Sequence, residues 1–241
     1  MTSNHGHALA SLVIVAAGRG ERYGHPCKVM EVAADRPLLA WSLDAAMQAG
    51  SISEVIVVAG VDGQSSIERV VTDGAWTKPV RIVPGGARRQ DSVAAGVLAA
   101  SESSDLILVH DGARPLAPAE LFDECAAVAM AHGAAIAAVP VSDTLKRVEE
   151  QRISDTVSRA GLWAAQTPQG FRRSILVPLL TRATSSDVEF TDEASLLEAQ
   201  GGIVYVVQGS RMNLKVTVRE DLAMVDALLR LRKADESGVM S

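Results

Sequence analysis

Residues 12–22 read LVIVAAGRGER, an apolar run that passes directly into glycines and arginines. A short run of Val, Ile and Leu that ends in glycine is typical of a buried β-strand followed by a sharp turn. Glycine lets backbone N–H groups approach a phosphate closely, and Arg22 and the nearby Lys28 can neutralise its charge. We therefore predict a first strand over Leu12–Ala16 and a phosphate-binding loop after it. The loop lacks the Gly-Lys-Ser/Thr of a P-loop and, with Tyr23 in place of a third glycine, the dinucleotide-binding pattern; an ordinary turn with solvated arginines is the alternative.

Further apolar runs alternate with longer amphipathic stretches along the rest of the chain. The expected strands are Leu12–Ala16, Val55–Ala59, Val80–Val83, Leu106–Val109, Ala134–Val139 and Ile203–Val207. The expected helices are Pro37–Ala49, Gln64–Thr72, Arg89–Ala100, Pro118–His132, Arg172–Thr181, Thr191–Gln200 and Arg219–Lys233. Strands that are apolar on both faces and alternate with helices predict an α/β fold with a mostly parallel, twisted sheet. We expect a single domain over residues 1–241, because domains usually hold about 100–200 residues.

The composition excludes several classes of protein. Lys and Arg total 23 against 29 Asp and Glu, a net charge of −6, which argues against binding to nucleic acid. The longest apolar runs are far shorter than the roughly 18 residues of a membrane-spanning helix, so we expect no membrane partner. The two cysteines, Cys27 and Cys125, cannot form a disulfide framework, and no Cys/His pattern indicates zinc. The sequence thus predicts a cytoplasmic globular protein.

Residues 142–161 interrupt the alternation, because they are polar, densely charged and without a helix-length apolar stripe. A long excursion of this kind in a compact domain is usually functional or disordered. Ordered-looking sequence resumes at Gly161, so we interpret the segment as a protruding hairpin or arm. An ordinary solvated insertion is the alternative on composition alone.

The predicted strand ends carry the residues best suited to hold a ligand, since ligands of open α/β sheets bind beyond the carboxyl ends of the strands. The third strand leads into PGGARRQDS, residues 84–92, which places a glycine pair before a helix start. The fourth ends in HDGARP, residues 110–115, where Asp111 could hold sugar hydroxyls or a metal ion and Arg114 a second phosphate. An Asp at a strand end is also a common turn residue, and we expect His110 to be structural rather than a catalytic base.

Glycine-rich or basic loops therefore converge in the predicted fold, while the chain shows no Ser/His/Asp set and no reactive-cysteine signature. Lys215 in NLKVT, residues 213–217, adds another basic group, although a lone Lys there is usually a surface residue. Phosphoryl or nucleotidyl transfer depends mainly on positioning and charge stabilisation, so it fits these residues better than hydrolysis does.

Eight segments carry specific patterns: residues 16–28, 85–93, 110–115, 140–147, 159–163, 167–169, 191–195 and 213–217. In this order and spacing they resemble the 2-C-methyl-D-erythritol 4-phosphate cytidylyltransferases of the non-mevalonate isoprenoid pathway. The resemblance covers nearly the whole chain, from about Leu12 to Leu229. It implies a Rossmann-like nucleotidyltransferase fold and a homodimer with exchanged arms, in which the Ser142–Arg159 arm of each subunit reaches the active site of the other.

The resemblance also implies roles for the matched positions. The CTP nucleotide would contact Ala16, Ala17, Gly18, Gly20, Gly86, Arg89, Ser92, Asp111 and Gly112. Methylerythritol phosphate would contact Asp111, Arg114, Thr144, Arg159 and Thr167, with Thr144 and Arg159 supplied by the other subunit. Arg22, Lys28 and Lys215 would stabilise the transition state. Mg²⁺ would be held mainly by the CTP phosphates rather than by an assigned set of protein ligands.

Two other functions stay open. A ribitol-5-phosphate cytidylyltransferase would share the fold and several motifs, but its first loop tends to read Ala-Gly-Gly, whereas this chain reads Ala16-Ala17-Gly18. A non-catalytic nucleotide-binding protein would be expected to lack a basic residue at position 22, 28 or 215. All three basic residues are present, so the sequence favours cytidylyl transfer from CTP to methylerythritol phosphate with release of diphosphate.

Overall fold

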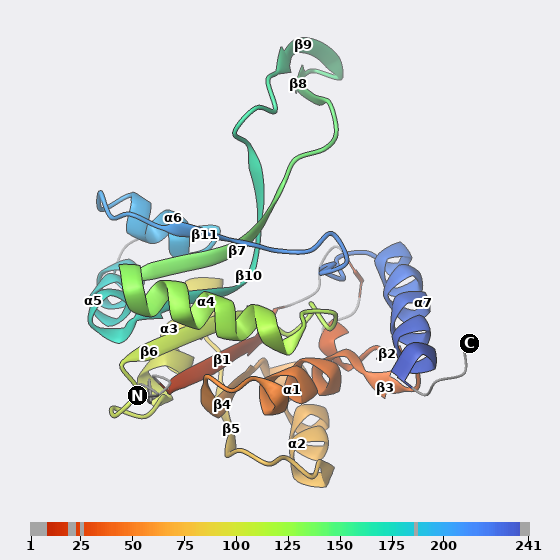
Figure 1. Cartoon of the computed structure of the whole chain (residues 1–241), viewed down its shortest axis with the longest axis vertical. Helices are drawn as coiled ribbons and strands as arrows, with labels where there is room; N and C mark the ends of the chain where they lie inside the picture. Colours follow the sequence, from red (N-terminus) through yellow and green to blue (C-terminus); the bar gives the residue numbers. More distant parts are fainter. Residues whose placement is uncertain (1–8, 19–22, 25–26, 186–187, 237–241) are drawn as a thin grey trace, which may run out of the picture.

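The computed structural model describes residues 9–18, 23–24, 27–185 and 188–236, and its centre is a seven-stranded sheet (Figure 1). The strand order is β11-β7-β10-β6-β1-β4-β5. All strands of this sheet run parallel except β10, which is antiparallel to both β6 and β7. The bounds are β1 Ala10–Ala16, β4 Ile52–Ala59, β5 Val80–Pro84, β6 Leu106–Asp111, β7 Ala134–Pro140, β10 Trp163–Arg172 and β11 Tyr205–Gln208.

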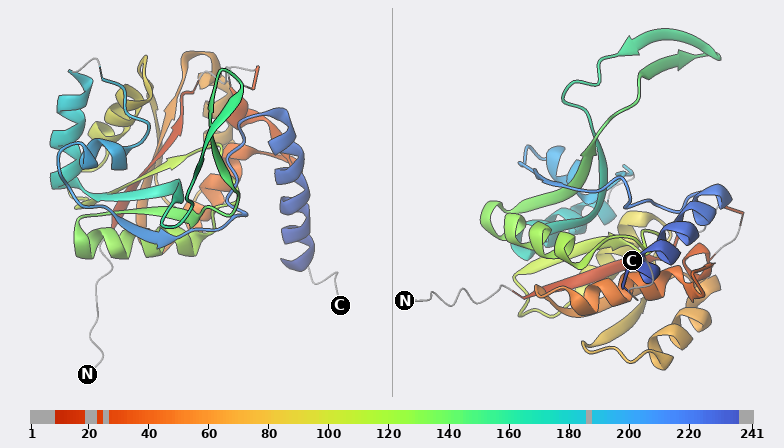
Figure 2. Two further views of the ribbon diagram at one scale, coloured as in Figure 1. Left: turned by 90° about the horizontal axis from the view of Figure 1, so that it is seen from above. Right: turned by 45° about the vertical axis from the view of Figure 1, so that its right-hand side comes forward.

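Helices cover both faces of the sheet, which gives three layers (Figure 2). Successive residues of a strand point to opposite faces, so Leu12 and Ile14 of β1 join one apolar core while Val13 joins the other. The first core lies under α1 Leu38–Gln48, α2 Gln64–Asp73 and α4 Ala119–His132. The second lies under α3 Arg89–Ala99, α5 Arg173–Thr184 and α6 Glu193–Glu198.

The helix α7, Arg219–Glu236, packs beside this sandwich against a small hairpin of β2 Val32–Ala33 and β3 Arg36–Pro37. Its buried Val225 and Leu229 share a third apolar cluster with Tyr23, Trp41 and Val216. The indole of Trp41 donates a hydrogen bond to the Ala33 carbonyl at 3.0 Å, which ties the hairpin to α1. The cluster therefore joins the flank of the first glycine loop to the segment that contains Lys215.

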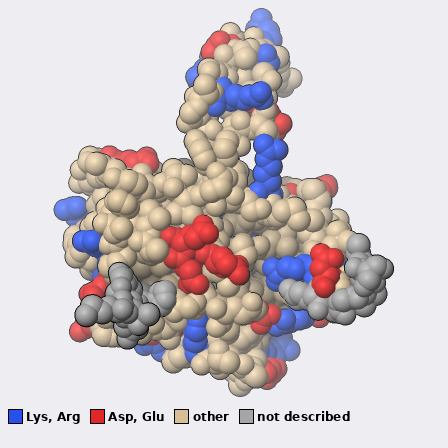
Figure 3. Space-filling model, viewed as in Figure 1, with Lys and Arg blue, Asp and Glu red and all other residues tan. Residues whose placement is uncertain are grey.

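A two-stranded arm projects from the sheet, as the hairpin interpretation predicts (Figure 1). It consists of β8 Leu145–Glu149 and β9 Arg152–Val157, which pair antiparallel. The turn residues Glu150 and Gln151 both have positive φ, 48° and 64°, as a two-residue hairpin turn requires. Basic and acidic side chains both occur on the arm (Figure 3), so it presents a mixed rather than a single-sign surface.

The predicted strands and helices are confirmed apart from small differences at their ends. The sequence pattern does not predict β10, because WAAQTPQGFR contains a proline and no Val or Ile. The last strand, predicted to begin at Ile203, begins two residues later, at Tyr205, and Ile203 is 73% exposed. None of the described helices is long and apolar enough to cross a membrane. That the whole chain forms one domain stays a prediction.

Candidate active site

One edge of the sheet gathers the residues expected to bind ligands. Because β1, β4, β5, β6, β7 and β11 run parallel, the loops after their carboxyl ends lie along the same edge, and the antiparallel β10 begins there. The arm leaves this edge after Pro140 and returns to it at Trp163. The segment that contains Lys215 follows β11 at the same edge. The fold thus brings together loops that are up to about 200 residues apart in sequence, as the strand-end rule predicts.

Asp111, the last residue of β6, is the centre of this edge. Its carboxylate is 2.6 Å from Lys215 Nζ and 3.8 Å from both an Arg89 Nη2 and the Arg114 Nε. Burial disfavours its charged form, but the charges of Lys215, Arg89 and Arg114 outweigh burial and hold the pKa of Asp111 well below its usual range. Asp111 is therefore an anion surrounded by three cations, and a ligand that approaches it meets net positive charge.

Glu193 holds the Arg89 guanidinium in place. Arg89 begins α3, and it donates to the two carboxylate oxygens of Glu193 at 2.6 and 3.1 Å. Glu193 is only 2% exposed. Burial lowers the pKa of Arg89, but the charges of Glu193 and Asp111 outweigh it and raise that pKa, so the arginine stays charged. Glu193 is not among the predicted site residues, although the acidic start of its helix lies within residues 191–195, one of the eight matched segments.

Thr167 and His110 fix the backbone at Asp111. The Asp111 N–H donates to Thr167 Oγ1 at 3.0 Å, and this hydroxyl is 3.0 Å from His110 Nδ1. His110 Nε2 lies 3.2 Å from the Arg114 carbonyl. Burial lowers the pKa of His110 to about 4, so the ring is neutral, with Nε2 donating to the carbonyl and Nδ1 accepting from Thr167. His110 is therefore a structural residue, as the sequence suggests.

A cavity of about 320 Å³ opens beside this cluster, and glycines and alanines make up most of its lining, together with Cys27, Val61 and Asp62. Its lining includes Gly60 and Gly63 after β4, Gly85 and Gly86 after β5, Ala16 at the end of β1, and Ala17. A side chain on Gly85 would come within 2.5 Å of Ala17 Cβ and 2.9 Å of Ser92 Oγ. The Gly86 N–H donates to Ser92 Oγ at 3.1 Å, so these two residues, both expected to bind nucleotide, are in contact. The small residues that line the cavity would let a ligand approach the backbone closely.

Lys28 lies between two buried neighbours at the same edge. It begins a short 3-10 helix, η1 Lys28–Met30. The buried Cys27 packs closely against Gly63. The buried Val29 lies beside Gly112, since a Cβ atom added to Gly112 would be 3.4 Å from a methyl carbon of Val29. Lys28 itself is half-buried. The structure therefore anchors its backbone between the loops that follow β4 and β6.

Other predicted residues lie elsewhere. Thr144 and Arg159 stand at the base of the arm, where both are exposed and Arg159 donates to the Ser142 carbonyl. Gly18, two residues after β1, is exposed. Gly20 and Arg22 lie outside the described residues.

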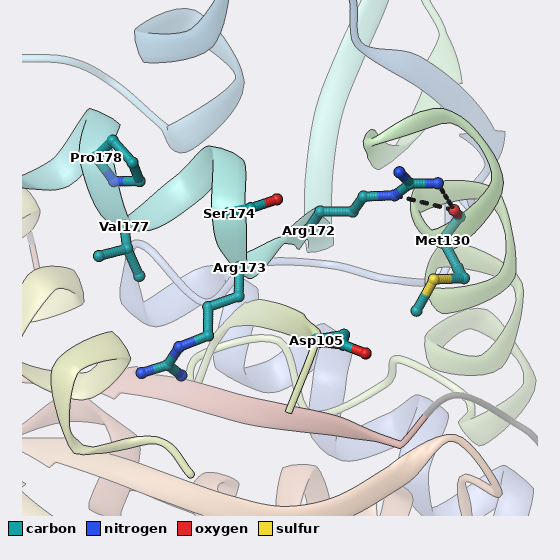
Figure 4. A pocket seen from close by; sticks show the side chains of 7 residues that line it. All are labelled: Asp105, Met130, Arg172, Arg173, Ser174, Val177 and Pro178. Atoms are coloured by element: carbon teal, nitrogen blue, oxygen red, sulfur yellow. Dashed lines mark hydrogen bonds between the residues drawn. The ribbon is translucent and has the colours of Figure 1, made fainter. Parts of the chain in front are cut away.

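The opposite edge of the sheet holds a separate, larger cavity of about 710 Å³ (Figure 4). Its Arg172 donates to the Met130 carbonyl at 3.1 and 2.5 Å, and its Arg173 donates to the Ser101 carbonyl at 3.1 Å. These carbonyls lie at the ends of α4 and α3, where cations are favourable partners. We therefore assign both arginines to the fold rather than to a ligand.

Nucleotidyl transfer needs a pocket for a base beside fixed positive charges for phosphates, and both lie together at the carboxyl edge. The fold and the site accordingly define the class of the α/β nucleotidyltransferases.

Comparison with known proteins identifies the family within this class. A sequence model of 2-C-methyl-D-erythritol 4-phosphate cytidylyltransferase matches residues 10–231. The chain is 43% identical to the enzyme of that name from Microcystis aeruginosa, over 92% of this chain and 99% of the relative, and 44% identical to the one from Prochlorococcus marinus, over 92% and 98%. The crystal structure of the enzyme from Thermus thermophilus is 32% identical, with a TM-score of 0.77, over 92% of this chain and 99% of that one. The chain belongs to the 2-C-methyl-D-erythritol 4-phosphate cytidylyltransferase family.

Proposed function

We propose that the protein transfers the cytidylyl group of CTP to 2-C-methyl-D-erythritol 4-phosphate and releases diphosphate. Membership of the family supports this reaction, and the observation that carries it is the group of Lys215, Arg89 and Arg114 around Asp111 beside the glycine-lined cavity. The product is 4-diphosphocytidyl-2-C-methyl-D-erythritol, an isoprenoid precursor. The two free cysteines suit a reducing cytoplasm as the place of this reaction.

The glycine-lined cavity is the proposed site of the cytosine ring. Gly86 and Ser92 would contact the base through backbone and hydroxyl groups, and the loop from Ala16 would hold the phosphates. Asp111 and Gly112 would meet the ribose hydroxyls. The absence of a side chain at Gly85 supports this assignment, because any larger residue would reduce the space between Ala17 and Ser92.

The reacting groups need positioning more than proton transfer. A phosphate monoester has a second pKa near 6, so its oxygen is already anionic at neutral pH and can attack without a general base. This oxygen attacks the α-phosphorus of CTP in line, the new P–O bond forms, and the bond to diphosphate breaks. Lys28, Lys215 and Arg22 would stabilise the negative charge that builds on the α-phosphate oxygens, which is usually the largest contribution to catalysis.

Mg²⁺ is the proposed metal, and most of its ligands would come from the CTP phosphates, because three cations already surround the Asp111 carboxylate. Mg²⁺ is usually bound by one or two carboxylates together with substrate phosphates, and Asp111 offers one ionised carboxylate at the reacting edge. When bound, the ion would neutralise charge on the departing diphosphate. Lys215 and Arg89 already contact or approach Asp111, so the triphosphate would supply most of the ligands.

The arm is proposed to complete the active site of a second copy of the chain. Thr144 and Arg159 are exposed at its base, and Val148 and Ile153 near its tip are 56% and 65% exposed. Two defective variants test this proposal. In a mixed dimer of Lys215→Ala and Arg159→Ala chains, one site combines an intact Lys215 with an intact arm from the partner. Mixing should therefore restore activity; no recovery in a dimer shown to have exchanged subunits would contradict arm exchange.

The experiment that tests the reaction is diphosphate release from CTP and Mg²⁺ with methylerythritol 4-phosphate and ribitol 5-phosphate offered in parallel. We expect kcat/KM for methylerythritol phosphate to be higher by about a hundredfold or more, since a site built for one set of hydroxyls strongly rejects another. A preference for ribitol phosphate would keep the mechanism and change the substrate. Release with neither acceptor, despite binding of CTP, would contradict the proposed function.

A further inference from the structure

Asn213 joins the segment that contains Lys215 to the strand β10. Its side chain is buried, at 1% exposure, and its Nδ2 donates to the Thr167 carbonyl at 2.9 Å and to Gln166 Oε1 at 3.3 Å. Gln166 in turn donates from Nε2 to the Ser210 carbonyl at 2.8 Å. Two buried carboxamides thus connect β10 to this segment at three points.

The backbone of the same segment is fixed on both sides of Lys215. The Asn213 carbonyl accepts a hydrogen bond from Arg114 Nη1 at 2.7 Å, and the Val216 N–H donates to the Ala113 carbonyl at 2.9 Å. Lys215 lies between these two anchors, and its ammonium is 2.6 Å from Asp111. A change at Asn213 would therefore move Lys215 without removing any group of Lys215 itself.

The contacts of Asn213 are also asymmetric. Its Nδ2 has two acceptors, whereas its Oδ1 is buried without a hydrogen-bond partner among the described residues. A buried acceptor without a partner is unfavourable, and such departures from good pairing concentrate at functional sites. This asymmetry indicates that the amide is oriented so that its Nδ2 reaches the Thr167 carbonyl and Gln166 Oε1, which favours a role in positioning the segment over a role in stability alone.

We propose that Asn213 is a positioning residue for catalysis. It holds Lys215 against Asp111 by tying the segment that contains Lys215 to the main chain of Thr167, and it does not itself contact the substrates. The proposal rests on the proposed function, because the consequence of moving Lys215 is loss of charge stabilisation in the transition state. The competing explanation is that Asn213 only stabilises the fold.

The experiment compares Asn213→Ala with Met212→Ala, a neighbour whose side chain is 52% exposed. Displacement of a catalytic group by about 1 Å can lower turnover about 100-fold, so we expect a decrease of that order in kcat for Asn213→Ala. The affinity for CTP, measured by calorimetry with Mg²⁺ and no acceptor, should stay within about threefold, because the cavity is built by the loops after β1, β4 and β5. Met212→Ala should leave both quantities unchanged.

Two outcomes of these measurements would overturn the proposal: a kcat for Asn213→Ala within about threefold of the wild-type value, or a loss of CTP affinity equal to the loss of kcat. If Asn213→Ala does not fold, Gln166→Ala removes the other half of the bridge and should give the same separation of kcat from CTP affinity, to a smaller extent. Where both single variants fold, the double variant should lose less than the product of the two single losses, since both changes act on one bridge.

Amine labelling gives a readout that does not need turnover. Acetylation of Lys215, followed by mass spectrometry, should be severalfold faster in Asn213→Ala, because the ammonium is no longer held against Asp111. Labelling of Lys78, which donates to the Ala46 carbonyl on another element, should not change. An unchanged rate at Lys215 would contradict the positioning role, whereas a wild-type protein that releases no diphosphate would contradict the proposed function instead.

Discussion

The guanidinium of Arg89 and the carboxylate of Glu193 form a paired contact, with Nη1–Oε1 at 2.6 Å and Nη2–Oε2 at 3.1 Å, although the two residues are 104 positions apart. Arg89 begins α3 and Glu193 begins α6. The pair fixes the two helix starts relative to each other. It also directs Arg89 toward Glu193 and leaves a longer distance of 3.8 Å to Asp111.

Glu193→Gln should therefore destabilise the protein and change the site. Breaking a buried ion pair by removing one partner lowers the free energy of unfolding by about 3–5 kcal/mol, because the remaining charge is left buried. Urea denaturation measures this change. Arg230→Ala, which breaks an exposed ion pair with Asp226, should change the stability little. Equal losses of unfolding free energy in the two variants would contradict the prediction that the Arg89–Glu193 pair stabilises the fold more than an exposed ion pair does.

Lys215→Ala should lower kcat by about 100-fold or more, since removal of one group that stabilises developing charge has an effect of that size. Lys28→Ala should act in the same direction. Single-turnover measurements with saturating CTP separate this effect from binding. Arg69→Ala removes a positive charge from the exposed face of α2 and serves as the control. A near-normal kcat would remove the substituted lysine from the catalytic residues.

Gly85→Ala should reduce the affinity for CTP by about tenfold or more, because the added methyl group would overlap Ala17 and Ser92 within the cavity. Calorimetric titration with CTP measures the change. Gly50→Ala is the matched control, since a methyl group there meets only Asp123 Oδ2, at 3.8 Å. If Gly85→Ala binds CTP as tightly as Gly50→Ala does, the base does not occupy this cavity.

His110 should make the free energy of unfolding depend on pH. Burial lowers the folded-state pKa of His110 from 6.5 to about 4, so between these values the unfolded chain binds the proton more readily than the folded one. Stability should therefore fall as the pH drops from about 6.5 toward 4, by on the order of 1 kcal/mol per pH unit.

The variant His110→Gln isolates this contribution, because a Gln amide can still donate toward the Arg114 carbonyl but does not titrate. Its stability should vary less with pH in that window than the stability of the wild-type protein. An unchanged slope in His110→Gln would show that other groups cause the acid sensitivity.

The sequence predicted the parts of the fold that repeat a simple pattern. The apolar strands β1, β4 and β6 and the helices between them follow from periodicity, and the glycine loops follow from the strand ends. The strand β10 was not predicted, because a strand made of small and polar residues gains its stability from neighbours on both sides, which no local pattern reveals.

The same limit applies to the candidate site. Asp111 and Lys215 were both singled out from local motifs, but their 2.6 Å contact depends on a fold that brings positions 104 residues apart together. Glu193, Gln166 and Asn213 were not assigned roles, because a buried partner is recognised by what it contacts and not by its own neighbours in sequence. The roles assigned to the individual site residues stay predictions.

The third apolar cluster has a consequence for how the molecule is completed during synthesis. Val225 and Leu229 of α7 pack with Tyr23 and Trp41, about 200 positions earlier in the chain. A ribosome produces all the glycine loops well before it produces this helix, and contacts so distant in sequence form late. Val216, next to Lys215, packs in the same cluster and gains that support only once α7 has emerged. Because Lys215 itself is made only shortly before α7, a partly synthesised chain would have the nucleotide cavity before it has a complete set of charges around Asp111.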